Sequence, residues 1–306
     1  MNDAPLVSIL MNCYNGEKYL QEAIDSVLNQ TYQNWELIFW DNQSKDKSAE
    51  FFLNNNDPRL HYYLSPFHTE LGNARIMASE KIKGDWLAII DTDDVWEPNK
   101  LTKQINAINN TKLSRETIGM VYCRVVEIDK NSVIVKELCH KDYVDAPMPE
   151  GKILYDLLFK GNLIASPTIL INVKIFLSVG GFPNEYSNAS DYYISCAISS
   201  KANIICVNEC LAQYRIHENN NTYKQKIISC EEQLKIFNVW SDFINISLIK
   251  KNMRIKQLHT LAGLMMIKYN KQIIKGLLRI VIKGNLFFAM KNLALELKKV
   301  IKIIKS

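Results

Sequence analysis

Two aspartates separated by one residue, Asp91 and Asp93, are the strongest candidates for chemistry in this chain. Carboxylates at this spacing can face one hard cation, and such a cation bridges diphosphate oxygens well. Alternatively, they could form a solvated acidic turn, or Asp94 could cap a helix that starts near Pro98. The apolar stretch before them and the Trp96-Glu97-Pro98 segment after them make the pattern more specific than an isolated Asp-x-Asp.

The aspartates follow one of several short apolar segments that we expect to be buried strands. Residues 6–11, 35–40 and 85–90 are rich in β-forming side chains, and helical periodicity separates them. This alternation predicts βαβ units and a mostly parallel, doubly wound α/β sheet. Ligands bind at the carboxyl ends of strands in such sheets, so polar clusters at these ends are expected to converge. The clusters are Asn12 with Tyr14, Asp41 with Asn42, and Asp91 with Asp93.

The remaining elements are predicted from the same periodicities. Further strands are expected over 60–64, 120–128, 133–138, 204–207 and 211–215, and helices over 48–53, 73–83, 151–159, 173–179 and 191–202. From about residue 224 the pattern is helical, with turns expected near Gly263, Gly276 and Gly284. We therefore predict an α/β domain over 1–222 and a basic amphipathic helical region over 223–306.

Charge is distributed unevenly along the chain. From Thr222 onward there are 17 Lys and Arg against 4 Asp and Glu, whereas the preceding residues are net acidic. No apolar run in the basic part reaches the roughly 20 residues that span a bilayer. Apolar faces with cationic flanks suit helices lying on an anionic membrane, although these helices could instead pack on the first domain. Nucleic-acid binding fits less well because the helices are very apolar.

The chain carries no sign of secretion. Its first residues lack the basic and apolar regions of a secretory signal. The seven cysteines are odd in number and scattered, which does not indicate a disulfide framework and favours a reducing compartment. We therefore expect a cytoplasmic protein.

Three segments in order resemble inverting glycosyltransferases of family 2. They are residues 7–48, residues 72–101, and the Gly180-Gly181-Phe182 turn followed by ASDYYISCAIS. The resemblance covers about residues 6–217 and implies the GT-A fold. It also implies transfer of a sugar from a nucleoside diphosphate to an acceptor hydroxyl, with Mn²⁺ or Mg²⁺ as cofactor.

The resemblance implies a role for each matching residue. Donor binding falls to Asn12, Tyr14, Asp41, Asn42, Arg75, Asp91 and His217; metal binding falls to Asp93 with Asp91; the catalytic base is Asp191. Arg215, in the Tyr-Arg-Ile-His segment, fits the stretch that follows the last core strand of the family.

Two positions depart from the family pattern. Asn42 stands where the family has a second aspartate that commonly reads the uracil edge, and Ser190 stands where it has a glutamate before the catalytic aspartate. An amide both donates and accepts hydrogen bonds, so Asn42 can still pair with a base. A UDP-sugar is therefore the favoured donor.

A glycan or lipid-linked acceptor is expected, in bacterial surface polysaccharide biosynthesis at the inner face of the cell membrane. A nucleotidyltransferase would also combine such a domain with metal carboxylates. That class has a glycine-rich phosphate loop near the first strand, which residues 12–20 do not contain. A non-catalytic nucleotide-sugar-binding scaffold is a further alternative, and turnover would distinguish it from an enzyme.

Overall fold

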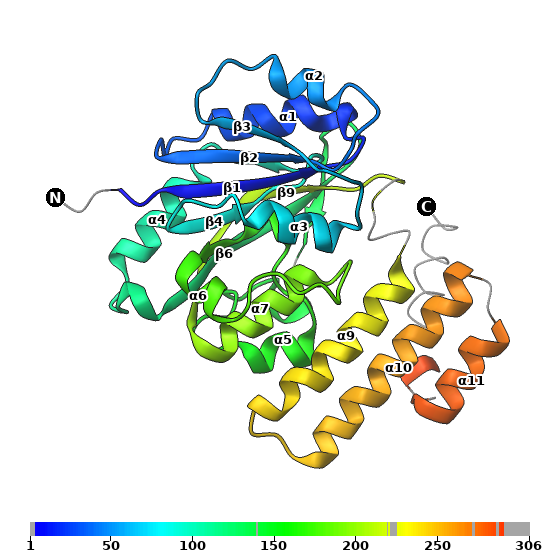
Figure 1. Cartoon of the computed structure of the whole chain (residues 1–306). Coiled ribbons are helices and arrows are strands. Elements are labelled where there is room, and N and C mark those ends of the chain that lie inside the picture. Colours follow the sequence, from blue (N-terminus) through cyan, green and yellow to red (C-terminus); the bar gives the residue numbers. More distant parts are fainter. Residues whose placement is uncertain are drawn as a thin grey trace. The chain divides into compact units, whose positions relative to one another are not determined.

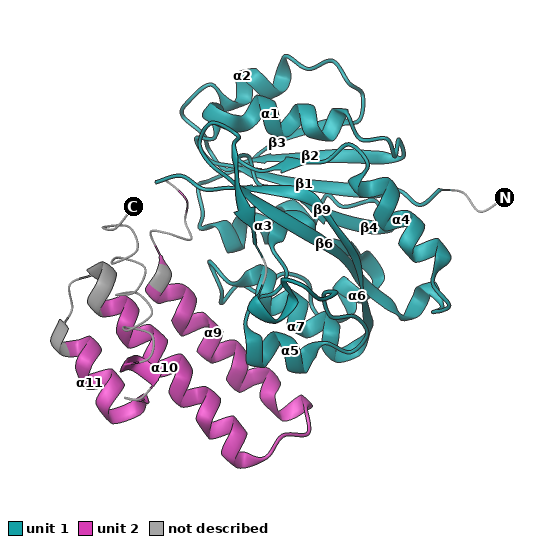
Figure 2. Ribbon diagram, turned by 180° about the vertical axis from the view of Figure 1, so that it is seen from behind, with its two compact units in different colours: residues 1–218 teal, residues 219–306 magenta. Residues whose placement is uncertain are grey.

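The computed structural model describes residues 4–138, 140–218, 220, 225–270, 273–285 and 288–290. The chain divides into two compact units, Met1–Glu218 and Asn219–Ser306 (Figure 2). The first unit contains all the described strands, and the described elements of the second unit are helices.

A single mixed sheet forms the centre of the first unit. In the described residues its strand order is β3-β2-β1-β4-β8-β6-β9-β5, and β7 pairs with β6. The strands are β1 (Val7–Cys13), β2 (Trp35–Asp41), β3 (Leu60–Leu64), β4 (Trp86–Ile89), β5 (Val95–Trp96), β6 (Ile118–Ile128), β7 (Ile134–Glu137), β8 (Leu170–Asn172) and β9 (Asn203–Arg215). Most strands run in one direction, whereas β5, β7 and β8 run against their neighbours. The predicted fold class is thus confirmed as a mixed α/β fold with a mostly parallel sheet.

Helices cover both faces of this sheet, as Figure 1 shows for α1 and α2 on one side and α3, α6 and α7 on the other. The helices of the first unit are α1 (Glu17–Leu28), α2 (Ser48–Leu53), α3 (Leu71–Ser79), α4 (Lys100–Asn110), α5 (Leu154–Lys160), α6 (Val173–Ser178) and α7 (Ser190–Lys201). Coverage of both faces explains why β1 and β2 read as continuous apolar runs in the sequence.

Alternate residues of β1 face opposite helical layers. Val7, Ile9 and Met11 belong to a core cluster with apolar side chains of α1, α2 and α4. On the other face, Gly119 of β6 allows α7 to approach closely, because a Cβ atom there would lie 2.4 Å from Ile198. The sheet is therefore packed between two helical layers, which position the ends of its strands.

One predicted break is absent. Two strands were expected at 204–207 and 211–215, but β9 is continuous over both. Its register with β6 shifts between Cys123 and Val125, where the polar pair Asn208–Glu209 forms an irregularity within the strand. A bulge and a turn share this polar signature, so the sequence pattern alone was misleading.

The second unit contains α9 (Lys226–Trp240), α10 (Leu248–Asn270) and α11 (Ile273–Lys283), and both α9 and α11 pack on α10 (Figure 2). The turns predicted near Gly263 and Gly276 are wrong, because these glycines lie within α10 and α11. A Cβ atom on Gly263 would lie 2.8 Å from the carbonyl oxygen of Gly276, so the glycines permit close helix packing. Gly284 does follow the end of α11.

Two general expectations can be compared with the described residues. None of their helices has the length and hydropathy required to cross a membrane. The six described cysteines all have free thiols, and Cys139 lies outside the described residues. Parts of the basic region, including residues 291–306, also lie outside them.

Candidate active site

The predicted polar clusters lie at one edge of the sheet. Strands β2 and β4 flank β1 in parallel, with Cys13 opposite Asp41 and Leu10 opposite Ile89. The loops that follow these three strands therefore leave the sheet side by side. This places the segments after β1, β2 and β4 next to one another, as the sequence predicted.

Arg75 of α3 connects the predicted site residue Asp91 to the first residue of α7. Its guanidinium is buried and donates to Asp91 Oδ1 at 3.1 Å, to Ser190 Oγ at 3.0 Å and to Ser166 Oγ at 3.4 Å. Ser190 is the first residue of α7, so this one side chain ties the loop after β4 to the start of α7. Burial raises the pKa of Asp91, and the adjacent guanidinium opposes that rise.

Asp191 follows Ser190 in the first turn of α7, close to this arginine. Its Oδ2 accepts from Asn162 Nδ2 at 3.2 Å and its Oδ1 from the backbone of Tyr192 at 2.8 Å. Burial raises the pKa of the Asp191 carboxyl above its usual range, while Arg75 and these hydrogen bonds act in the opposite direction. A carboxylate with a raised pKa is better suited to accept a proton near neutral pH than an exposed aspartate.

Asp93 pairs with the histidine predicted from the end of the domain. His217 Nε2 lies 2.9 Å from Asp93 Oδ2, and both side chains are mostly buried. The imidazole ring also packs on Tyr19 of α1, with ring centroids 5.2 Å apart. The loop after β4 and the segment after β9 thus present a carboxylate and an imidazole at one place.

Asp94 does not cap a helix, which corrects the alternative considered from the sequence. Helix α4 starts at Lys100, and Asp94 instead accepts from the backbone N–H of Arg215 at 3.0 Å. The carboxyl is fully buried with no hydrogen-bond partner for Oδ2. Burial, with Asp93 and Asp91 nearby, raises its pKa well above the usual range.

Asp41 and Asn42 are both buried and both hold the backbone of their surroundings. Asp41 accepts from Tyr62 Oη at 2.7 Å and from the backbone of Ser44 at 2.7 Å. The Asn42 amide donates to the carbonyl of Thr69 at 2.7 Å and accepts from its N–H at 3.1 Å. In this structure the Asn42 amide is therefore engaged with the protein backbone.

Tyr14 forms an exposed aromatic pair with His68, a residue that sequence reasoning missed. Their ring centroids are 4.1 Å apart, and His68 Nδ1 lies 3.0 Å from the carbonyl of Asn42. Because a carbonyl only accepts, Nδ1 carries the proton and Nε2 remains an acceptor in the neutral ring. The nearby Asn12 amide is buried with no partner for either its nitrogen or its oxygen, which is the condition of a group that awaits a ligand or water.

Four further residues, His68, Asn162, Ser166 and Tyr19, contact the predicted site residues although the sequence did not single them out. They have no distinctive spacing, and common polar or aromatic side chains carry no signal of their own. Gly161 directly precedes Asn162 and has a φ of +99°, a conformation that favours glycine. This glycine is the local sequence signal for a turn at Asn162.

The donor atoms of Asp93 and His217 suit a divalent cation. Ligands at neighbouring corners of an octahedron of about 2.1 Å radius lie about 3 Å apart, close to the observed 2.9 Å. Among the described residues no three His, Cys, Asp or Glu side chains form a metal cluster. Mg²⁺ is typically held by one or two protein carboxylates together with substrate phosphates, so this sparse donor set fits.

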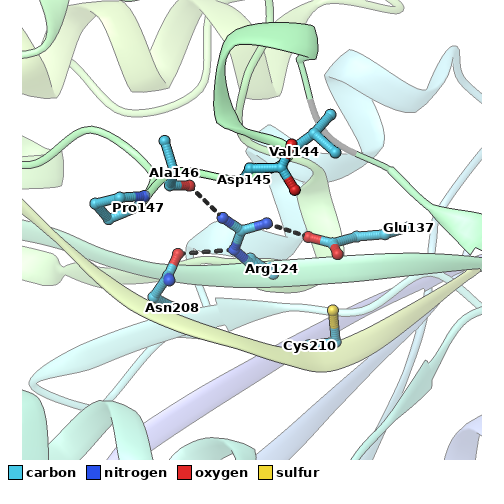
Figure 3. A pocket seen from close by; sticks show the side chains of 8 residues that line it. All are labelled: Arg124, Glu137, Val144, Asp145, Ala146, Pro147, Asn208 and Cys210. Atoms are coloured by element: carbon cyan, nitrogen blue, oxygen red, sulfur yellow. Dashed lines mark hydrogen bonds and ion pairs between the residues drawn. The ribbon is translucent and has the colours of Figure 1, made fainter.

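A cavity of about 430 Å³ lies elsewhere, between β6, β7 and β9 and the loop at 144–147 (Figure 3). Arg124 occupies its centre and bonds Asn208, Glu137 and the carbonyls of Tyr143 and Ala146. The predicted site residues do not line this cavity. Because the guanidinium is already bonded on every nitrogen, we assign the cavity no ligand.

The mixed α/β fold, with helices on both faces of a mostly parallel sheet, is the fold of GT-A glycosyltransferases. Residues 8–166 match the model of glycosyl transferase family 2, and the chain belongs to that family. Among curated proteins it is 32% identical over 206 residues to UDP-Glc:alpha-D-GlcNAc-diphosphoundecaprenol beta-1,3-glucosyltransferase WfgD of Escherichia coli, covering 67% of this chain and 74% of that protein. It is 31% identical to an uncharacterized glycosyltransferase of Rickettsia typhi, covering 72% of this chain and 66% of that protein.

Solved structures share the fold at low sequence identity. The mannosyltransferase PcManGT of Pyrobaculum calidifontis, in complex with GDP-Man and Mn²⁺, aligns with a TM-score of 0.61 and 17% identity, over 97% of this chain and 81% of that one. S. aureus TarS in complex with UDP-GlcNAc aligns with a TM-score of 0.60 and 14% identity, over 87% of this chain and 74% of that one. At these identities the likeness supports the fold alone.

Proposed function

We propose that this protein is an inverting, metal-dependent glycosyltransferase that moves a sugar from a nucleoside diphosphate to an acceptor hydroxyl. One observation carries the proposal: Arg75 joins the Asp91 loop to the helix start that bears Asp191. A carboxylate site for the donor and a partly buried carboxylate suited to proton transfer are thereby kept at one edge of the sheet. This is the arrangement that a direct displacement requires.

Asn12, Tyr14, Arg75 and Asp91 hold the donor in this proposal. The unpartnered Asn12 amide and the exposed Tyr14 ring offer hydrogen-bonding and stacking groups beside each other on β1 and its loop. Asp93 and His217, with Asp91 nearby, would hold Mn²⁺ or Mg²⁺, which supplies charge neutralisation for the departing diphosphate. Asp41 and Asn42 support this region through Tyr62 and Thr69.

Asp191 acts as the general base. Its carboxylate takes the proton of the acceptor hydroxyl while the acceptor oxygen bonds to the anomeric carbon. The bond from that carbon to the diphosphate oxygen breaks on the opposite face, and the nucleoside diphosphate leaves with the electron pair. A single displacement of this kind inverts the anomeric configuration. Asn162 and the backbone of Tyr192 hold the carboxylate in place.

A UDP-sugar is the donor that we favour. TarS has a crystal structure in complex with UDP-GlcNAc, and WfgD is named for UDP-Glc, whereas the structure of PcManGT is a complex with GDP-Man. The N3–H group of uracil is a hydrogen-bond donor that matches an acceptor such as His68 Nε2, whereas N3 of cytosine carries no hydrogen. The Asn42 amide, held by Thr69, is not required for this pairing.

We further propose a lipid-linked glycan acceptor and peripheral contact with the anionic inner face of the cell membrane. The acceptor named for WfgD is a diphosphoundecaprenol-linked sugar, and its pathway class would be surface polysaccharide biosynthesis. On α11, Leu277, Leu278, Val281 and Ile282 are each at least half exposed. Exposed lysines flank them at positions 275 and 283. An apolar helix face with cationic flanks is suited to an anionic bilayer surface.

Calorimetric titration of UDP, GDP, dTDP and CMP, with Mn²⁺ or Mg²⁺ and again with EDTA, tests the donor site. Tight metal-dependent binding of one nucleotide is expected, and binding of none to folded protein would overturn the proposal.

The Asp191→Asn variant distinguishes an enzyme from a non-catalytic scaffold that only binds the nucleotide sugar. The scaffold is the alternative function, because Asn42 and Ser190 depart from the family pattern. This variant should bind nucleotide as the wild type does and lose transfer by about 10²- to 10⁴-fold. Transfer at the wild-type rate would remove Asp191 from the mechanism.

A further inference from the structure

Arg215 is a fully buried arginine at the end of β9, and its contacts converge on the acidic loop after β4. Its Nε donates to the carbonyl of Asp93 at 2.8 Å, and its backbone N–H donates to Asp94 Oδ1 at 3.0 Å. Its guanidinium lies 4.4 Å from the centre of the Tyr19 ring, on which His217 also packs. Arg215 thus holds the backbone of Asp93, while the side chain of Asp93 remains with His217.

Two side chains from other elements also contact this guanidinium, as does the carbonyl of Asp129, which accepts from Nη1 at 3.2 Å. Glu22 of α1 accepts from Arg215 Nη2 at 2.6 Å, and Ser132 Oγ accepts from Nη1 at 2.9 Å. Ser132 Oγ in turn donates to the other carboxylate oxygen of Glu22 at 2.8 Å. The three side chains form a closed ring of hydrogen bonds that joins α1, the β6–β7 turn and the end of β9. We call these three residues, Glu22, Ser132 and Arg215, the clamp.

Two features of the clamp indicate that it holds the backbone of Asp93 in place. Ser132 adopts a left-handed backbone conformation, with φ of +63°, which is unfavourable for a serine. The ion pair between Arg215 and Glu22 also buries a charged group completely on the arginine side, which is tolerated when every hydrogen bond is satisfied. Both features bring the turn onto Arg215 and so onto the Asp93 backbone.

We propose that the clamp is a positioning device for the Asp93–His217 pair, and that Glu22 and Ser132 set how well this pair binds a divalent cation with a nucleotide. The part of the inference that concerns the cation and the nucleotide rests on the proposed function, whereas the part that concerns the positioning of Asp93 and His217 rests on the structure alone. None of the three residues needs to touch the substrate. They act through the loop that carries Asp93 and through the segment that carries His217.

Hydrogen exchange of the free protein tests the positioning without any ligand. Glu22→Gln removes the charge of the clamp, and Ser132→Gly removes the hydroxyl at a backbone conformation that glycine adopts freely. Both should speed exchange of the Asp94 and Arg215 amides severalfold, leaving the β1 amides unchanged. Asp25→Asn, an exposed position on the same helix, is the matched control. Exchange unchanged from the control in both variants would overturn the proposal.

Nucleotide titration at a series of Mn²⁺ concentrations tests the consequence. The same two variants should need about five- to tenfold more Mn²⁺ for half-maximal UDP binding and should recover the wild-type affinity at saturating Mn²⁺. If the affinity for UDP fell and saturating Mn²⁺ did not restore it, or if only the thermal stability fell, the clamp would have a purely structural role. Either result would overturn the proposal that it positions the Asp93–His217 pair. If wild-type protein binds no nucleotide, the proposed function fails, whereas the exchange result still decides the positioning.

Discussion

The Nε2 atom of His217 lies 2.9 Å from Oδ2 of Asp93, although 124 positions separate the two residues in the chain. Asp93 follows the central strand β4, and His217 follows β9, which is the next-to-last strand in the sheet. The two loops can meet because β9 runs in the same direction as β4, so that the carboxyl ends of both strands lie on the same side of the sheet. This contact links the acidic loop to the last segment of the first unit.

Replacing His217 with alanine should weaken metal-dependent nucleotide binding. The variant removes one of two donor atoms already held at the spacing of a metal-coordination edge, so we expect about tenfold weaker Mn²⁺-dependent binding of UDP. Asp93→Asn should have a larger effect because it removes charge as well. Calorimetry with and without EDTA measures both. An unchanged metal dependence in His217→Ala would exclude the histidine from the metal site. His61→Ala, at a partly exposed position on β3, serves as a control.

Asn162→Ala should shift the pH profile of transfer without affecting donor binding. The Asn162 amide stabilises ionised Asp191, whose pKa burial already raises, so its loss should raise that pKa further. A base must be deprotonated to work, so activity is lost as pH falls through its pKa. The acid limb of kcat/KM should therefore move to higher pH in the variant. An acid limb at the wild-type position would show that Asp191 does not control this ionisation.

Lys100 makes the stability of the protein depend on pH in the alkaline range. Its ammonium is fully buried 3.9 Å from the centre of the Trp96 ring, and burial lowers its pKa from 10.5 to about 8. Between these two pH values the unfolded chain therefore binds more protons than the folded protein, and the free energy of unfolding increases as pH rises from about 8 to 10.5. Below pH 8 the buried ammonium lowers the free energy of unfolding by roughly 3 kcal/mol.

Lys100→Met should accordingly be more stable than the wild type at neutral pH, less what is lost with the Trp96 contact and the hydrogen bond to Gln104. The difference between the two proteins should narrow between pH 8 and 10. Denaturant unfolding at several pH values measures that difference and cancels the titration of other groups. A difference independent of pH would mean that the amine is not perturbed.

The exposed face of α11 should govern membrane binding. Val281→Glu together with Ile282→Glu removes two apolar side chains, each worth about 1.5 kcal/mol on burial, so binding to vesicles should fall at least tenfold. Cosedimentation with phosphatidylcholine vesicles, with and without phosphatidylglycerol, measures it. Leu53→Glu, an exposed position on α2, is the control. Equal binding of the variant and the wild type would show that another surface contacts the membrane. If the molecular mass of the wild-type protein in solution increased with its concentration, the exposed face of α11 would instead bind a second copy of the chain.

Local patterns in the sequence were sufficient for most elements of the first unit. Helix α2 and strand β3 were predicted with the boundaries found, because their apolar periodicity and flanking polar residues act within a few positions. The same signals failed at Asn208–Glu209, where a bulge resembles a break, and at Gly263, where close helix packing resembles a turn. In both cases a distant partner decides the conformation of the chain.

The sequence by itself determined the class of protein, through the ordered motifs that resemble family 2. It also determined the alternation of strands and helices in the first part of the chain and the residues at the three strand ends, because alternation and strand-end polarity follow from local burial. Only the tertiary structure decided that Arg75 joins Asp91 to Ser190, that Asn42 is held by Thr69, and that Glu22 and Ser132 meet on Arg215. Such contacts depend on strand register and helix packing between distant segments. Common polar residues carry no local signal of that pairing.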